Sequence, residues 1–67
     1  MSSLQYNHDS RRFTVGEHEL HCGEVIQVKS NGTWIETRIE HNSNGWYFVH
    51  VSPNDPWRWI NHEARLA

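Results

Sequence analysis

The stretch EVIQVKSNGTWIETRIEHNSNGWYFVHV, residues 24–51, decides the fold. Its alternating and apolar runs predict three β-strands, at Glu24–Lys29, Thr33–His41 and Trp46–Val51. The turns between these strands, at Ser30–Gly32 and Asn42–Gly45, carry Asn and Gly, which tolerate the positive φ angles of tight turns. The three strands are therefore expected to form a meander.

A shorter hairpin is expected upstream of this meander. Leu4–Asn7 and Arg12–Val15 alternate apolar and polar residues on either side of a polar turn. A brief extended piece follows around Leu20, and Met1–Ser3 is expected to be loose. Helical spacing of apolar residues is absent throughout, which favours an all-β domain.

The downstream segment carries two prolines and two further short elements. Ser52–Pro56 is expected to break the ladder, because proline cannot donate a hydrogen bond to a neighbouring strand. Trp57–Ile60 predicts a short strand, and Asn61–Ala67 predicts a helical turn or a last strand. So few short strands leave unpaired edges in an open sheet, so residues 1–67 are expected to form one small five- or six-stranded barrel.

Composition limits the classes of function. The 67 residues carry a formal net charge of −2, which argues against a general nucleic-acid binder with a dense field of Lys and Arg. The single cysteine, Cys22, excludes an internal disulfide framework and favours a reducing compartment. No apolar run suggests a signal peptide or a membrane span, so a cytoplasmic location is predicted.

Side-chain parity along the longest predicted strand separates a core face from an outer face. Successive side chains of a strand point to opposite sides, so residues two apart share a face. The core face is expected to hold Thr33, Ile35, Thr37 and Ile39. The outer face is expected to hold Trp34, Glu36, Arg38 and Glu40. Trp34 is therefore predicted to be a half-exposed aromatic ring among charges, which is more informative than an exposed Leu.

From His21 to Leu66 the order of features resembles a Tudor or chromo-barrel domain, which is an SH3-like fold. The resemblance is carried by Gly23–Val28, Gly32–Trp34, Arg38-Ile39, Gly45–Val49, Trp57–Ile60 and Arg65-Leu66. The resemblance implies an SH3-like barrel. Tudor-type barrels surround a methylated Lys or Arg with a cage of aromatic rings through cation–π attraction, so the resemblance also implies such a cage here.

A second resemblance is closer in wording. The segments His21–Glu24, Trp34–Glu40 and Gly45–Tyr47 are similar to a family of small uncharacterised proteins of Gram-positive bacteria, their plasmids and their phages. The Trp-rich ending, Ser52–Ala67, departs from the usual pattern of that family. This resemblance implies no activity.

The candidate binding residues are aromatic side chains with a few charged neighbours. They are Trp34, Tyr47, Trp57 and Trp59, with Asp55 as an anionic wall and Arg38 beside them. A surface patch around Trp34, Trp57 and Trp59, or an exposed strand edge, predicts a non-catalytic module that binds a protein or peptide. The opposing interpretation is that a small chain needs most of these rings in its core.

Single-stranded nucleic acid is the alternative partner. Small barrels can combine base stacking on aromatic rings with phosphate contacts. The basic residues available for this are Arg11, Arg12, Arg38, Arg58 and Arg65. Eight acidic residues and a single Lys count against this alternative.

Metal binding and catalysis are the least favoured functions. His18, His21 and Cys22 lie within five residues, and His18-x-x-His21 is one half of a zinc pattern. The sequence offers no convincing second half, and adjacent His21 and Cys22 would point to opposite faces of an extended chain. Cys22 with His21 or His50 could in principle form a thiol–imidazole pair. Without a recognisable oxyanion-hole motif, we expect no enzyme activity, no bound metal and no cofactor.

Overall fold

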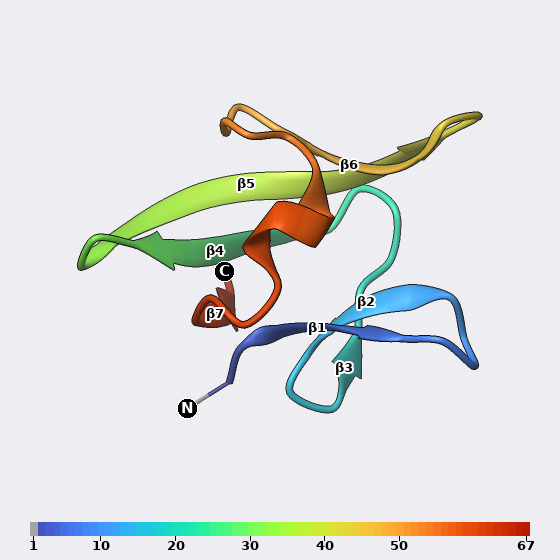
Figure 1. Cartoon of the computed structure of the whole chain (residues 1–67), viewed down its shortest axis with the longest axis horizontal. Helices are drawn as coiled ribbons and strands as arrows, with labels where there is room; N and C mark the ends of the chain where they lie inside the picture. The colour runs from blue at the N-terminus through green and yellow to red at the C-terminus, as the bar shows by residue number, and fades with distance from the viewer. Residues whose placement is uncertain (1) are drawn as a thin grey trace.

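A computed structural model describes residues 2–67, and within this range the chain is all-β apart from one 3₁₀ turn (Figure 1). The elements are β1 (Leu4–Asn7), β2 (Arg12–Val15), β3 (His18–Glu19), β4 (Val25–Ser30), β5 (Thr33–Asn42), β6 (Gly45–Val49), the 3₁₀ helix η1 (Pro56–Trp59) and β7 (Ala64–Leu66). The all-β prediction is confirmed. The sequence predicts five or six strands, whereas these residues form seven, because β3 and β7 each add a short strand.

The first sheet is antiparallel, with the order β1-β2-β3. The predicted hairpin is confirmed, with Leu4 opposite Val15 and Asn7 opposite Arg12. Its turn is closed by two contacts of Asn7: the side-chain Oδ1 accepts from the Asp9 N–H at 2.9 Å, and the carbonyl accepts from the Arg11 N–H at 2.8 Å. Polar turn residues therefore fix the register of the hairpin.

The second sheet is also antiparallel, with the order β6-β5-β4-β7. The predicted turn between β4 and β5 is confirmed, because Asn31 and Gly32 have φ angles of 52° and 78° between the paired residues Ser30 and Thr33. Positive φ at both central residues suits the right-handed twist of the flanking strands. The predicted meander of β4, β5 and β6 is thus confirmed.

The two sheets are joined by main-chain hydrogen bonds on one side of the molecule. Ser3 forms a β-bridge with Glu63, and the Leu4 N–H donates to the His62 carbonyl at 2.9 Å. The Ser2 carbonyl accepts a further hydrogen bond from the Ala64 N–H. Ser2 and Ser3, expected to be loose, are therefore paired, whereas Met1 lies outside the described residues. These contacts cover strand edges that would otherwise be open.

Side chains bring the sheets together on the opposite side. The Trp46 indole Nε1–H of β6 donates to the Arg11 carbonyl at 3.1 Å, beside the β1–β2 turn. The Arg12 guanidinium of β2 lies 5.7 Å from the Trp46 ring centroid, within range of a cation–π contact. The sheets thus enclose one core, while the SH3-like arrangement stays a prediction.

The core draws side chains from both sheets and from η1. It consists of Leu4, Phe13, Val15, Leu20, Ile26, Val28, Ile39, Phe48, Trp59 and Ala64. The predicted parity of β5 is confirmed where the strand crosses the core, because Thr37 and Ile39 are buried while Glu36 and Arg38 are exposed. Thr37 is tolerated there because its hydroxyl donates to the Val49 carbonyl at 2.7 Å.

Pro56–Trp59 form the 3₁₀ helix η1 and Ile60 follows it in a turn, so the predicted strand at Trp57–Ile60 is wrong. The Asp55 carboxylate caps the turn by accepting from the Trp57 N–H at 3.0 Å, and Pro56 occupies the first helical position, where a missing N–H costs nothing. The last predicted element is confirmed in its strand form as β7. Among residues 2–67, no helix is long and apolar enough to cross a membrane.

Candidate functional site

A surface groove of about 570 Å³ lies where β1, the β5–β6 hairpin and the start of η1 meet. Its aromatic lining, called here the aromatic groove, consists of Tyr6, Trp46, Tyr47 and Trp57. Asp55 lines the groove beside Trp57, and Arg11 and His41 also contribute to its walls. Residues distant in sequence are therefore brought together by the pairing of the two sheets.

Trp57 is the most exposed aromatic side chain of the groove, and it is held in place from below. Its exposed fraction is 52%, yet its ring centroid lies 4.6 Å from that of Tyr6 and 5.1 Å from that of Phe13. Tyr6 and Phe13 are themselves an edge-to-face pair at 4.9 Å. A ring fixed in this way loses little side-chain entropy when a partner covers its outer face.

Trp46 is fixed by contacts on several sides. Its indole Nε1–H donates to the Arg11 carbonyl, and the His41 ring meets it edge to face at 4.6 Å. The Arg12 guanidinium approaches the ring from β2. The groove therefore has a rigid wall at the β6 side as well as at the η1 side.

Asp55 places a carboxylate at the rim of the groove. The side chain is exposed, and within residues 2–67 its one hydrogen bond is accepted by Oδ1 from the Trp57 N–H. The same residue thus caps η1, orients Trp57 and leaves a carboxylate oxygen facing solvent. An aromatic face beside a carboxylate is suited to a cation, because the negative face of the ring and the acid attract the same charge.

A family model matches residues 2–59, described as a domain of unknown function (DUF5348). The chain belongs to the DUF5348 family. No curated protein and no solved structure matches the chain. All residues of the aromatic groove lie inside the DUF5348 match, from Tyr6 to Trp57, whereas the last strand, β7, lies beyond it.

The structure of this DUF5348 domain brings together only part of the predicted patch. Tyr47, Asp55 and Trp57 line the same groove. Tyr6 and Trp46 complete the groove, although the sequence assigns them only to strands. Each of the two is a large aromatic residue on an edge strand of its sheet, which is a signal for a surface ring. The sequence alone does not show how the two sheets pack, so it could not place these two rings in one groove.

Trp59 is not a surface residue, so its assignment to the patch is wrong. Only 4% of its side chain is exposed, and it belongs to the core. Its indole Nε1–H donates to the Pro53 carbonyl at 2.8 Å, which satisfies the only polar atom of the ring. The indole therefore anchors the 52–56 loop instead of contacting a partner.

Trp34 is half-buried among charges, as predicted, but it lies outside the aromatic groove. The Arg65 guanidinium lies 4.0 Å from its ring centroid, and the Lys29 ammonium lies 5.4 Å away. The chain's own cations thus cover this ring. Arg38 also lies outside the groove, where its Nε donates to a Glu40 carboxylate oxygen at 2.7 Å.

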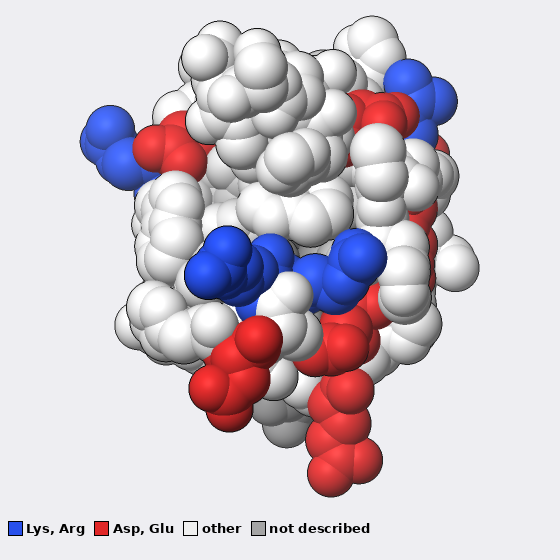
Figure 2. Space-filling model, turned by 90° about the vertical axis from the view of Figure 1, so that its right-hand side faces the viewer, with Lys and Arg blue, Asp and Glu red and all other residues white. Residues whose placement is uncertain are grey.

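Charges of both signs occupy the face that includes the tips of the β1–β2 and β5–β6 hairpins. Figure 2 shows basic side chains in the middle of this face and acidic side chains gathered below them. A surface that attracts nucleic acid without base recognition normally presents a continuous positive field. This face does not present such a field.

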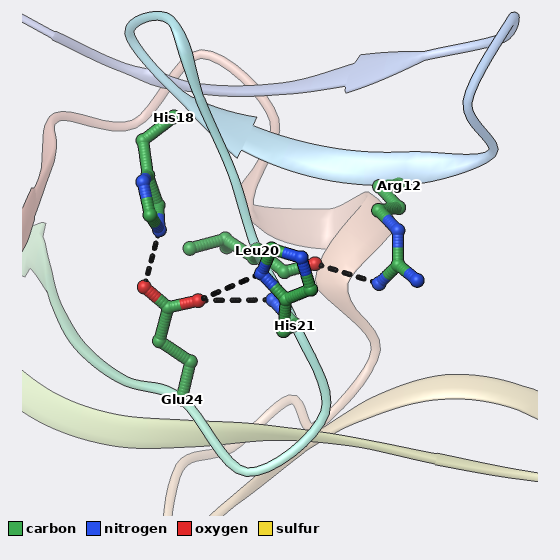
Figure 3. A network of polar contacts seen from close by, with 5 residues as sticks. All are labelled: Arg12, His18, Leu20, His21 and Glu24. Atoms are coloured by element: carbon green, nitrogen blue, oxygen red, sulfur yellow. Dashed lines mark hydrogen bonds and ion pairs between the residues drawn. The ribbon is translucent and has the colours of Figure 1, made fainter.

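Three polar side chains outside the aromatic groove converge at the β3–β4 connection (Figure 3). The His18 Nε2 lies 2.5 Å from one oxygen of the Glu24 carboxylate, and the His21 Nδ1 lies 3.6 Å from the other. Cys22 points elsewhere, with its Sγ 3.1 Å from a Glu40 carboxylate oxygen. The predicted opposite orientation of His21 and Cys22 is consistent with these contacts.

Proposed function

We propose that this DUF5348 domain is a non-catalytic module that binds a segment of another protein in its aromatic groove. The observation that carries the proposal is Trp57, which keeps 52% of its surface exposed although Tyr6 and Phe13 hold it rigidly. Rigid, partly exposed Trp and Tyr rings are typical of the residues that dominate binding energy at protein interfaces. A small chain with a limited core gains nothing for its own stability from that exposure.

A basic side chain of the partner fits the groove best. Asp55 supplies a negative charge at the rim, and the rings of Trp57 and Tyr47 line the groove with it. A Lys or Arg placed over such a ring gains roughly 0.5–2 kcal/mol. The resemblance to Tudor domains adds methylated Lys or Arg as a finer possibility within the same chemistry.

Insertion of side chains into the groove is better supported than addition of a strand to the sheet. β6 is the edge strand beside the groove, and its Phe48 N–H already donates to the Asn54 carbonyl at 2.8 Å. A peptide that pairs with this edge would have to displace the 52–55 loop. Side-chain anchors on Trp57 and Tyr47 require no such rearrangement.

Single-stranded nucleic acid is the less supported alternative. The half-buried Trp34 ring is covered by Arg65 and Lys29, so a base would have to displace them before stacking. The net charge of −2 also opposes binding to phosphates.

The proposal can be tested by selecting linear peptides from a random displayed library on the immobilised domain. We expect the selected peptides to contain basic residues and to bind Trp57→Ala and Tyr47→Ala at least about tenfold more weakly than wild type. Asp55→Asn is the matched charge variant, because Asn retains the cap of η1 but removes the negative charge. Trp34→Ala is the control and should bind as wild type does.

The outcome that would overturn the proposal is equally clear. Selection that yields no binders, or peptides that bind the groove variants and wild type equally, would reject the groove as an interface. A parallel titration with single-stranded oligonucleotides at low salt tests the alternative. Loss of oligonucleotide binding in Trp34→Ala alone would favour the nucleic-acid function instead.

A further inference from the structure

The strongest unassigned chemistry outside the aromatic groove is the cluster of His18, His21 and Glu24. One ligand atom from each of these side chains lies within 4.8 Å of the other two. Figure 3 shows both imidazoles directed at the same carboxylate. The spacing His-x-x-His-x-x-Glu places His18 on β3, and His21 and Glu24 on the short connection from β3 to β4.

The connection is anchored at its centre by Leu20. This side chain is fully buried, its N–H donates to the Phe13 carbonyl at 2.8 Å, and its carbonyl accepts from the Arg12 guanidinium at 3.2 Å. His18 and His21 flank Leu20 in the sequence, so the position of their backbone is fixed by the core. Less conformational entropy is therefore lost when their side chains converge on a ligand.

The far side of the connection is anchored to β5. The Gly23 N–H donates to the Ile39 carbonyl at 2.7 Å, and the Ile39 N–H donates to the Glu24 carbonyl at 3.0 Å. Gly23 has a φ of +90°, a value that favours glycine, and the Glu24 N–H returns to the His21 carbonyl at 3.1 Å. This turn carries Glu24 back towards both histidines.

The orientation of the Glu24 carboxylate is fixed by the backbone of this turn. The His21 backbone N–H donates to one carboxylate oxygen at 2.9 Å, while the other oxygen lies beside the His18 Nε2.

We propose that His18 Nε2, His21 Nδ1 and a Glu24 carboxylate oxygen bind one divalent transition-metal ion, with Zn²⁺ as the best match and water completing the coordination. Two imidazoles and one carboxylate are a recurrent zinc ligand set that leaves one position open. Imidazole ligands favour Zn²⁺ over Mg²⁺ and Ca²⁺, which prefer oxygen. The site is independent of the aromatic groove.

The distances are compatible with a metal after small side-chain rotations. Zinc bonds to nitrogen and oxygen of about 2.0–2.2 Å place neighbouring ligand atoms of a tetrahedral site about 3.3 Å apart. The His18 Nε2 lies 2.5 Å from one Glu24 oxygen and the His21 Nδ1 lies 3.6 Å from the other. One ligand atom from each of the three residues lies within 4.8 Å of the other two, so a single carboxylate oxygen can approach both imidazoles after a small rotation. On binding, the neutral His18 imidazole coordinates the metal through the lone pair of Nε2 and carries its proton on Nδ1. The bond to the metal replaces the hydrogen bond between His18 Nε2 and Glu24.

This ligand set explains why the sequence pattern was incomplete. A search for a second Cys or His pair finds none, because the third ligand is a carboxylate three residues beyond His21. Cys22 is excluded from the set because its Sγ faces Glu40.

The test is calorimetric titration of the metal-free full chain with ZnCl₂, with imidazole nitrogen shifts followed by NMR in parallel. We expect one Zn²⁺ per chain, with shifts at the ring nitrogens of His18 and His21. Glu24→Gln and His21→Ala should each weaken binding at least about tenfold, because they remove ligands. His8→Ala and Cys22→Ser are the controls and should bind as wild type does.

Two results would overturn the proposal. One is a wild-type chain that does not bind Zn²⁺ above the level of Glu24→Gln. The other is a Cys22→Ser variant that loses Zn²⁺ binding while Glu24→Gln binds as wild type does, which would place the metal on the thiol. Circular dichroism of each metal-free variant checks that it is folded. If His21→Ala does not fold, His18→Ala replaces it as the second ligand variant.

Discussion

Trp57 and Trp59 belong to the same short 3₁₀ turn, yet their surroundings are opposite. Trp59 is 4% exposed, packs in the core and donates its indole N–H to the Pro53 carbonyl. Trp57 is 52% exposed and rests on Tyr6 and Phe13 at the rim of the aromatic groove. In a strand, residues two apart share a face, whereas a 3₁₀ helix rotates by about 120° per residue and separates them.

The difference shows how a small chain divides its aromatic residues between stability and binding. Pro56 and the Asp55 cap impose the turn, and the turn sends one indole inward and the other outward. The inward ring is expected to determine stability, and the outward ring is expected to determine affinity for a partner.

The largest effect is expected at Trp59. Trp59→Ala should lower the free energy of unfolding by about 3–5 kcal/mol, because it removes a buried indole and leaves a cavity. Trp57→Ala should cost only about 1 kcal/mol, the value of its contacts with Tyr6 and Phe13. Urea denaturation followed by circular dichroism measures both. Equal losses for the two variants would contradict the division.

The next effect concerns affinity. For a peptide selected on the wild-type domain, Asp55→Asn should weaken binding by several-fold less than Trp57→Ala, because a partly exposed charge contributes less than a desolvated ring. Isothermal titration at low and at physiological salt separates the two terms. Asp55→Asn should also remove most of the salt dependence, and a salt dependence that persists would show that the partner's charge contacts another residue.

How far the sequence alone could lead is clear from this pair. The β4–β5–β6 meander and the first hairpin were predictable, because alternating side chains and Asn-Gly turns are local signals. The sequence could not predict which of Trp57 and Trp59 is buried, because a segment of four residues is too short to distinguish a 3₁₀ turn from a strand by its pattern. The groove also needs Tyr6, whose contact with Trp57 depends on how the two sheets pack.

A third tryptophan allows a smaller test of the comparison. Trp34 is covered by Arg65, so Arg65→Ala should expose the ring and lower the free energy of unfolding by about 0.5 kcal/mol. Acrylamide quenching of tryptophan fluorescence should increase in this variant relative to wild type. Peptide affinity should not change, and a loss of affinity would extend the binding surface to Trp34.

The smallest effect is expected from charge rather than packing. Partial burial raises the pKa of Glu24, but the His21 backbone N–H, the hydrogen bond from His18 and the charges of both imidazoles outweigh this effect and lower the pKa below its ordinary value of 4.5. The ionised form of Glu24 therefore stabilises the fold above that pH. This stabilisation is lost as the pH falls below 4.5 through the folded pKa. Thermal melts of wild type and Glu24→Gln should therefore differ near neutral pH and converge in acid. A difference that is independent of pH would contradict a stabilising role of the ionised Glu24 carboxylate.

The most direct measurement of the central claim uses the indole N–H signals of the four tryptophans in a ¹⁵N-labelled sample. Titration with a peptide selected on the domain should shift the signals of Trp57 and Trp46 and leave those of Trp59 and Trp34 in place. Shifts confined to Trp34, or no indole shift with a peptide that binds, would contradict the aromatic groove as the binding site.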